Sequence, residues 1–253
     1  MIRFDIDGRV GIIRLDRVEA RNAINPAMAE AIEAAVDRLE DDDDLWLGVL
    51  THEGPVFCAG ADLKEVAAGN GAKLGTKRGG FGGIVLRERT KPLIAAVDGH
   101  AVAGGTEIAL ACDLRVATTS SVFGIPEVKR SLVAAAGGLN RLPRVLPPAI
   151  AMELALTGDT ITAERAHHFG MVNTVCEPGA AVECALDLAA RVNANAPLAV
   201  RASRQLVLDA PSLDDREGMR RAAAAMGELA GTDDFAEGPR AFIEKRPPEW
   251  QGR

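Results

Sequence analysis

The first forty residues show two hydrophobic patterns that differ in period. Short apolar-rich runs at 4–6 and 10–15 flank Asp7-Gly8, a strong two-residue turn signal, and this arrangement predicts a β-hairpin. From residue 26 to residue 39 the apolar residues instead recur at helical spacing. Asn25 directly precedes this segment, and asparagine is a favoured N-cap residue. We therefore expect a hairpin followed by an amphipathic helix.

Two short runs, 45–51 and 93–97, are almost continuously apolar. Runs of this length and composition are typical of strands that are buried on both faces of a sheet. Downstream of each run lies a glycine-containing turn that leads into a helical segment, Ala59-Gly60-Ala61 after the first and Gly104-Gly105 after the second. Because the first backbone N–H groups of a helix have no intrahelical acceptor, each turn can present free donors.

Residues 68–83 are rich in glycine, carry three basic side chains and have no hydrophobic period. They are either a mobile basic loop beside a site or a surface insertion, and they do not fit the GxGxxG dinucleotide-binding pattern. The next segment, 84–91, is expected to be a short helix that Pro92 ends. From residue 178 onward the pattern is helical. Strands and strand-turn-helix units followed by helices indicate an α/β core with a helical appendage.

Composition narrows the class of protein. The chain has 253 residues and a net charge of −7, which argues against general nucleic-acid binding because that function needs a cationic surface. Its four cysteines are scattered, so neither a disulfide framework nor a zinc site is expected. There is no signal-peptide pattern and no apolar run of membrane-spanning length. We expect a soluble, cytoplasmic protein.

Two glutamates stand out as candidates for chemistry. Glu107 follows the Gly104-Gly105 pair and should lie in the first turn of a helix, while Glu127 lies twenty residues further on. A carboxylate at a helix N-terminus is stabilised by the helix dipole, so an ordinary capping role for Glu107 is an alternative. If both glycine turns aim a backbone N–H at one point, they form an oxyanion hole, and the acids can transfer protons.

Several segments together resemble one family. FCAGADLKE, KPLIAAVDGHAVAGGTEIALACDLRVAT, FGIPEVK, AAAGGLNRLPR and EGPRAFIEKRPPEW are similar, in this order, to motifs of the crotonase, or enoyl-CoA hydratase/isomerase, superfamily. The resemblance implies a ββα spiral core over residues 1–195 and a helical C-terminal trimerisation region over 196–253. It implies acyl-CoA thioester substrates, no cofactor or metal, and a homotrimer or a dimer of trimers (homohexamer).

The resemblance also implies roles for particular residues. The oxyanion-hole donors fall on the N–H groups of Ala61 and Gly104, and the two glutamates of the hydratases match Glu107 and Glu127. The implied reaction is syn addition of water to a trans-2-enoyl-CoA to give a 3-hydroxyacyl-CoA, as in fatty acid metabolism and β-oxidation. In this reaction Glu107 positions and deprotonates the water, and Glu127 delivers or takes the Cα proton. The coenzyme A bound by this subunit is implied to lie near Ala59 and Lys64. Phe242 and Lys245 are implied to reach the coenzyme A bound by a neighbouring subunit.

The sequence departs from the family pattern in two places. Ala135 replaces a glycine whose N–H lies near the catalytic water, and its methyl group can narrow the acyl pocket. Lys129 and Arg130 are unusual cations beside Glu127, and they face either solvent, a polar acyl chain or the phosphates of coenzyme A.

Other activities stay open at this stage. Within the family these are enoyl-CoA isomerisation, dehydration of a polar acyl-CoA of the carnitinyl type, and thioester hydrolysis, because one fold can host several reactions. Outside it, the alternative is a non-catalytic paralogue that binds coenzyme A or RNA. Retention of both Glu107 and Glu127 favours hydration or dehydration, and the acidic charge balance argues against RNA.

Overall fold

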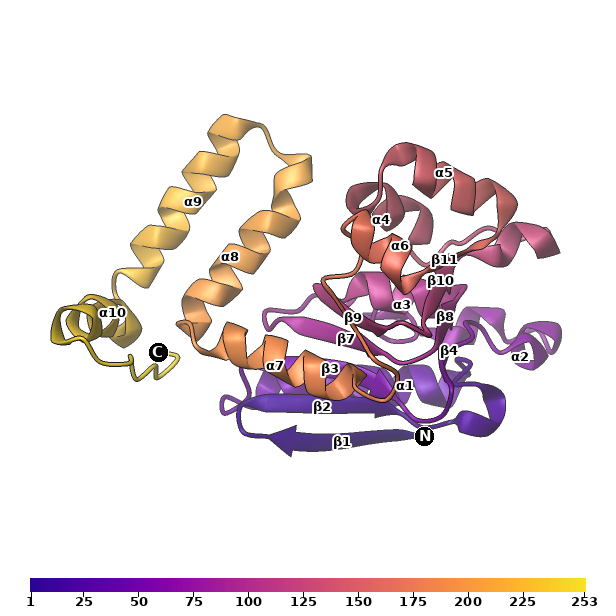
Figure 1. Cartoon of the computed structure of the whole chain (residues 1–253), viewed down its shortest axis with the longest axis horizontal. Helices are drawn as coiled ribbons and strands as arrows, with labels where there is room; N and C mark the ends of the chain where they lie inside the picture. The colour runs from indigo at the N-terminus through magenta and orange to yellow at the C-terminus, as the bar shows by residue number, and fades with distance from the viewer. The chain divides into compact units, whose positions relative to one another are not determined.

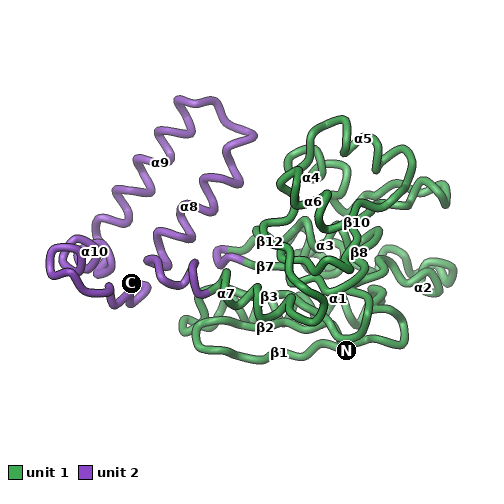
Figure 2. The backbone as a smooth tube through the Cα atoms, viewed as in Figure 1, with its two compact units in different colours: residues 1–89, 93–189 green, residues 90–92, 190–253 purple.

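The computed structural model describes residues 1–253, and the chain divides into two compact units (Figure 2). Unit 1 contains residues 1–89 and 93–189, and unit 2 contains residues 90–92 and 190–253. The division expected from the sequence, between 1–195 and 196–253, stays a prediction. No helix is both long and apolar enough to span a membrane.

Unit 1 is built around a six-stranded sheet with the strand order β1-β2-β3-β7-β9-β12. Its strands, in chain order, are β1 (Ile2–Asp7), β2 (Val10–Leu15), β3 (Leu47–His52), β7 (Leu93–Val97), β9 (Leu114–Thr118) and β12 (Thr174–Cys176). β1 and β2 form the antiparallel hairpin that Asp7-Gly8 predicts, and the other neighbours are parallel. Every residue of β3 and β7 is buried, which confirms the interpretation of the two apolar runs.

A second, four-stranded sheet has the order β11-β10-β8-β4. Its strands are β4 (Val56–Cys58), β8 (His100–Val102), β10 (Val122–Gly124) and β11 (Thr160–Thr162). The chain alternates between the sheets: β3, β7 and β9 in the first are followed by β4, β8 and β10 in the second, and each pair leads into a helix. Those helices are α2 (Leu63–Ala67), α3 (Gly104–Ala111) and the 3₁₀ helix η3 (Pro126–Arg130). This ββα spiral is the fold that the sequence predicts.

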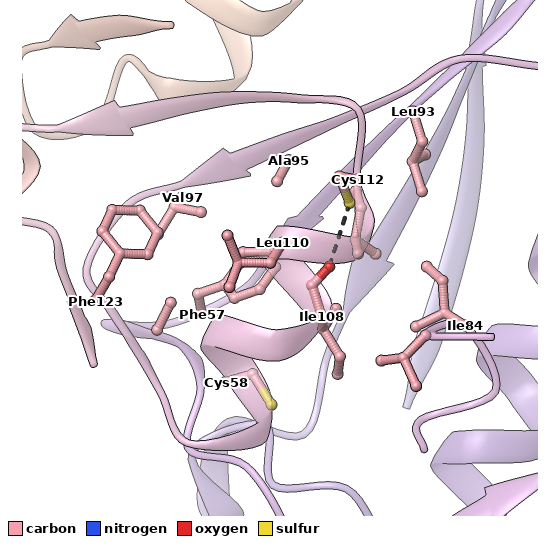
Figure 3. Packing of buried hydrophobic residues seen from close by; sticks show 14 of the residues in the cluster. Phe57, Cys58, Ile84, Leu93, Ala95, Val97, Ile108, Leu110, Cys112 and Phe123 are labelled. Atoms are coloured by element: carbon pink, nitrogen blue, oxygen red, sulfur yellow. Dashed lines mark hydrogen bonds between the residues drawn. The ribbon is translucent and has the colours of Figure 1, made fainter. Parts of the chain in front are cut away.

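Helix α3 lies in the core of the spiral. All of its residues from Gly104 to Leu110 are buried, although it is only eight residues long. Figure 3 shows Ile108 and Leu110 of α3 among buried side chains of the strands, including Phe57 and Phe123. A helix this short is unstable by itself in water, so packing on all sides must hold it. The first residues of α3 are therefore placed by a rigid core.

The remaining elements of unit 1 lie around the spiral (Figure 1). They are η1 (Val18–Ala20), α1 (Pro26–Asp41), η2 (Gly71–Leu74), β5 (Gly75–Thr76), β6 (Gly80–Phe81), α4 (Gly138–Val145), α5 (Pro148–Thr157), α6 (Ala163–His168) and the greater part of α7 (Ala181–Asn193). The Asn25 side chain accepts a hydrogen bond of 2.8 Å from the Met28 N–H, which confirms the predicted cap of α1.

The expectation of a helix at residues 84–91 needs correction. Residues 84–86 form a turn and residues 87–91 are not helical. Ile84 and Val85 are both buried in the core, and both of their N–H groups bond at 3.4 Å to the Phe81 oxygen instead of starting a regular helix. The glycine-rich segment before them contains η2 and the small β5–β6 sheet. It is tied to α1 through Glu33, whose carboxylate accepts hydrogen bonds from Thr76 Oγ1, the Gly79 N–H and Arg78.

Unit 2 is helical, as predicted. It contains α8 (Pro197–Asp209), η4 (Ala210–Ser212), α9 (Asp215–Leu229) and α10 (Asp233–Glu244), and α8 and α9 lie side by side (Figure 1). Its C-terminal residues fold back on α10, where Glu237 is paired with Arg246 and Asp234 accepts from the Gln251 N–H. Large apolar side chains are exposed on these helices: Val207, Met219, Phe242 and Ile243.

Candidate active site

A cavity of about 1000 Å³ opens in unit 1 and collects most of the residues singled out from the sequence. Seven of them line it: Ala59, Ala61, Lys64, Gly104, Glu107, Glu127 and Ala135. Phe242 and Lys245 belong to unit 2 and are not among the lining residues. Their contact with a neighbouring subunit's coenzyme A stays a prediction.

The two glycine turns are in direct contact with each other. Gly60 has a φ of +89°, and a Cβ atom at this position would lie 2.8 Å from Ala103 Cβ and 2.9 Å from the Gly104 nitrogen. Only glycine can combine this left-handed backbone with so close an approach. The turn after β4 and the turn after β8 are therefore packed together at one wall of the cavity.

Both predicted oxyanion donors are free. Neither the Ala61 N–H nor the Gly104 N–H donates a hydrogen bond within the chain, although the neighbouring Ile24 and Asp62 N–H groups bond across the Ile24–Ala61 bridge. Ala103, directly before Gly104, has a φ of 53° and a ψ of −129°, an unfavourable conformation for a residue with a side chain. The strain is concentrated where the backbone turns to present the Gly104 N–H at the cavity wall.

Glu107 is held in place by the loop before α4. Its side chain is only 3% exposed, and its Oε1 accepts a hydrogen bond of 2.9 Å from the Gly138 N–H. Burial raises its pKa above the ordinary value of 4.5, although the backbone N–H groups of Gly138 and Ala136 and the positive charge of Arg141 act in the opposite direction. Glu107 is thus a carboxyl group with a fixed orientation and a raised pKa.

Glu127 lies in a different environment. It is in the first turn of η3, is half-buried, and its buried Oε2 has no hydrogen-bond partner in the chain. Burial raises its pKa above 4.5, and the nearby carboxyl of Glu107 raises it further, whereas its own backbone N–H and Arg130 lower it. A buried polar atom without a partner is costly and often indicates a place for a ligand group. Here that atom belongs to a residue of the cavity wall.

One buried hydroxyl group, that of Thr106, connects the elements that carry the two acids. Thr106 Oγ1 lies 2.6 Å from the Ala101 oxygen of β8, and it accepts a 2.9 Å hydrogen bond from the Gly124 N–H of β10. Because Thr106 precedes Glu107 on α3 and Gly124 is close to Glu127 in the chain, this side chain ties the elements of both acids together. The sequence reasoning missed Thr106.

The sequence reasoning also missed two side chains of the cavity wall. Arg141 donates hydrogen bonds to the oxygens of Ala136 and Val85 and so holds the loop beside Glu107. The ring of Phe81 packs so tightly against Gly104 that a Cβ there would clash with it. Arg141 lies in the AAAGGLNRLPR motif, which could have indicated it, whereas Phe81 lies in a segment without any pattern.

The fold and the cavity together define a class of protein. A ββα spiral whose two strand-turn-helix junctions place free N–H groups in the same cavity as two carboxyls is a crotonase-type fold. Comparison with known proteins then identifies the family: the model of the enoyl-CoA hydratase/isomerase family matches residues 5–253. The chain belongs to this family, whose members act on acyl-CoA thioesters.

Individual relatives match over nearly their whole length. The chain is 36% identical to (E)-benzylidenesuccinyl-CoA hydratase of Thauera aromatica, covering 99% of each chain. It is 40% identical to enoyl-CoA hydratase EchA19 of Mycobacterium tuberculosis, with 97% of this chain and 94% of that protein covered. The crystal structure of an enoyl-CoA hydratase from M. tuberculosis H37Rv superposes with a TM-score of 0.95 at 45% identity, covering 100% of this chain and 99% of the other.

Proposed function

We propose that this protein is an enoyl-CoA hydratase that adds water across the double bond of a trans-2-enoyl-CoA to give a 3-hydroxyacyl-CoA. The observation that carries the proposal is the presence of two carboxyl groups, one fixed and one without a partner, in the same cavity as two free backbone N–H groups. The reaction needs no cofactor, because coenzyme A is part of the substrate.

The free N–H groups stabilise the charge that develops on the thioester. When water adds to the β-carbon, electrons move onto the thioester oxygen and produce an enolate. In the proposal, the Ala61 and Gly104 N–H groups donate to this oxygen. Losing one such donor typically lowers kcat by about 100- to 1000-fold. The tight packing at Gly60 supports this assignment, because the donors need a fixed separation.

The two carboxyl groups divide the proton transfers. We assign Glu107, oriented by the Gly138 N–H, to hold the water and accept its proton. We assign Glu127 to deliver a proton to the α-carbon. Hydration therefore starts with one carboxyl charged and the other protonated, and the mutual repulsion that raises the pKa of Glu127 favours such a mixed state.

The names of the relatives support water addition or its reversal. Besides the hydratases, carnitinyl-CoA dehydratase of Salmonella arizonae is 37% identical over 99% of this chain. The same two acids can catalyse dehydration, since the reaction is reversible and the microscopic steps are shared. Dehydration of a polar 3-hydroxyacyl-CoA is therefore the second candidate function.

A panel of purified trans-2-enoyl-CoAs tests the proposal through loss of the enoyl absorbance. We expect turnover by the wild type and strong loss in Glu107→Gln and Glu127→Gln. Absence of turnover on every substrate would refute the hydratase function. Wild-type activity in both variants would refute the site even if the protein hydrates enoyl-CoAs.

We further propose a trimer or a dimer of trimers that works in the cytoplasm, with Phe242 and Lys245 at a neighbouring subunit's coenzyme A. The exposed apolar side chains of α8, α9 and α10 support an assembly through unit 2. Mass measurement in solution tests it, and a stable monomer contradicts it.

A further inference from the structure

Glu127 shares its 3₁₀ helix with a cation that the proposed mechanism does not use. Arg130 is the last residue of η3, three positions after Glu127. Side chains three residues apart eclipse each other in a 3₁₀ helix, so Arg130 and Glu127 lie on the same side. Both line the cavity. Lys129 is offset from them, and its Nζ is bound to Asp159 Oδ1 at 2.8 Å.

Arg130 is unpaired, which separates it from other arginines of the cavity. Arg17 forms an ion pair of 2.8 Å with Asp62, and Arg141 donates to two backbone oxygens. Arg130 is exposed and forms neither an ion pair nor a hydrogen bond within the chain. Its positive charge acts through space on the carboxyl of Glu127, with which it forms no ion pair. The guanidinium is thus available to a ligand.

The unpaired cations of the cavity form two groups. Arg21 and Lys64 belong to the region of the first glycine turn, where the Ala59 N–H donates to the Arg21 oxygen. These are the cations beside the predicted coenzyme A position. Arg130 belongs to the element of Glu127, which in the proposed function lies at the reacting α-carbon. A cation there faces the acyl part of the substrate.

The surroundings of Arg130 indicate the chemistry of that acyl part. Leu132 and Val133 follow it in the chain, line the same cavity, and are 47% and 67% exposed. Apolar side chains beside one unpaired guanidinium suit an acyl chain with an apolar stem and an anionic end. Arginine is well suited to this because its planar fork binds a carboxylate through two parallel hydrogen bonds.

We propose that Arg130 is a specificity-determining residue that binds a carboxylate carried by the acyl chain of the thioester. The preferred substrate is then the coenzyme A monothioester of an unsaturated dicarboxylic acid. This inference rests on the proposed function for the position of the acyl group. The alternative anion for Arg130 is a phosphate of coenzyme A, and the experiment distinguishes the two.

The test compares two trans-2-enoyl thioesters that differ only in a free terminal carboxylate or its methyl ester, each made with coenzyme A and with phosphate-free pantetheine. Wild type, Arg130→Gln and the matched control Lys129→Gln are assayed for kcat/KM. We expect Arg130→Gln to lose about 10- to 100-fold on the carboxylate substrate in both series and to stay within about twofold on the ester. Lys129→Gln should behave as the wild type.

Other outcomes overturn the proposal. Equal losses on acid and ester in the coenzyme A series, with none in the pantetheine series, would show that Arg130 binds a phosphate. If kcat/KM is unchanged in Arg130→Gln, or changes by the same factor in Lys129→Gln, Arg130 does not determine specificity.

Dissociation constants of the saturated carboxylate and ester analogues supply a readout that needs no turnover. If no enoyl-CoA is hydrated, the proposed function fails, but a carboxylate preference in binding that Arg130→Gln abolishes still supports the role of Arg130. If this binding preference is absent from the wild type, the role fails even when hydration is observed.

Discussion

Glu107 and Glu127 are the same residue type in the same cavity, but they differ in burial and in hydrogen bonding. Glu107 lies on an eight-residue helix inside the core, is 3% exposed, and has its carboxyl oriented by the Gly138 N–H. Glu127 lies on a 3₁₀ helix at the surface, and its buried Oε2 has no partner. One acid is held by the protein, whereas the other has a hydrogen-bonding position open to a ligand.

The difference suggests how two identical side chains acquire separate tasks. A fixed carboxyl is suited to orienting a water molecule, because orientation needs a side chain with one conformation. A carboxyl without a partner is suited to exchanging a proton with substrate, since no hydrogen bond has to break first. The two environments, more than the residue type, distinguish the roles that we propose.

Replacing the two acids one at a time tests most directly whether they have separate tasks, and it should have the largest effect. Glu127→Gln and Glu107→Gln should each lower kcat by about 100- to 10,000-fold, because each removes a proton-transfer group. Exchange of the α-hydrogens of a saturated acyl-CoA in D₂O, followed by NMR, should separate them. We expect Glu127→Gln to abolish the exchange and Glu107→Gln to retain part of it.

Glu153→Gln is the matched control for this pair, since Glu153 is exposed and paired with Arg165. It should leave both the hydration rate and the α-hydrogen exchange unchanged. Equal exchange in Glu107→Gln and Glu127→Gln would show that the acids do not have separate tasks.

The comparison also assumes that both acids act beside a rigid oxyanion hole. Gly60→Ala should lower kcat by about 100- to 1000-fold, because the new methyl group pushes the Gly104 N–H away from its position. The free energy of unfolding should fall by about 1–3 kcal/mol from overpacking. Steady-state kinetics and denaturant unfolding measure the two effects.

Gly69→Ala is the control for this change. Gly69 also has a positive φ, +79°, but a Cβ there meets nothing within 4 Å. The Gly69→Ala variant should lose some stability through backbone strain, but its kcat should equal that of the wild type. If Gly69→Ala loses as much activity as Gly60→Ala, the contact between the two turns does not explain the loss of kcat.

A smaller effect is expected from the segment that carries Phe81 into the cavity wall. Although burial acts in the opposite direction, hydrogen bonds from Thr76, Arg78 and the Gly79 N–H hold the pKa of Glu33 below its ordinary 4.5. Glu33→Gln should therefore destabilise the protein by about 1–2 kcal/mol after allowance for solvent screening. It should also raise KM, because Phe81 loses its support, whereas kcat should change little.

The effect of Glu33 depends on pH in a defined direction. A carboxyl whose pKa is lowered by folding stabilises the protein above its ordinary pKa, and this stabilisation is lost as the pH falls through the folded value. The Tm values of wild type and Glu33→Gln should converge as the pH falls from 4.5 through the lowered pKa of the folded protein. The exposed Glu30, on the same helix, is the control, and Glu30→Gln should leave the Tm at pH 7 unchanged.

The smallest expected effect is on the stability of the folded protein, which the charged form of Glu127 lowers. Its pKa is raised in the folded protein, so the folded state binds its proton more tightly than the unfolded chain does. Stability is therefore lost as the pH rises from 4.5 through the folded pKa, and glutamine at this position avoids the loss. Glu127→Gln should raise Tm by about 1–3 °C at pH 7 and by nothing at pH 4. A lower Tm at pH 7 would show that the carboxylate is stabilised by folding.

Much of the fold could be predicted from residues that act locally. Asn25 caps α1, Asp7-Gly8 turns the hairpin, and the apolar runs form the buried strands β3 and β7. The prediction of a helix at 84–91 was wrong because Ile84 and Val85 are buried side by side, which long-range packing decides. The ββα spiral has no fixed period in the sequence, since β3, β7 and β9 begin at unequal intervals, and the family motifs were needed to predict it.

The sequence by itself determined the family, the two candidate acids and the two glycine turns, because short motifs carry these features and motifs need no long-range information. Only the tertiary structure decided that Gly60 touches Gly104, that Thr106 ties α3 to β10, and that Gly138 orients Glu107. It also decided that Lys129 pairs with Asp159 while Arg130 lines the cavity. Adjacent residues point in different directions only once a backbone conformation is set, and that conformation depends on packing between distant segments.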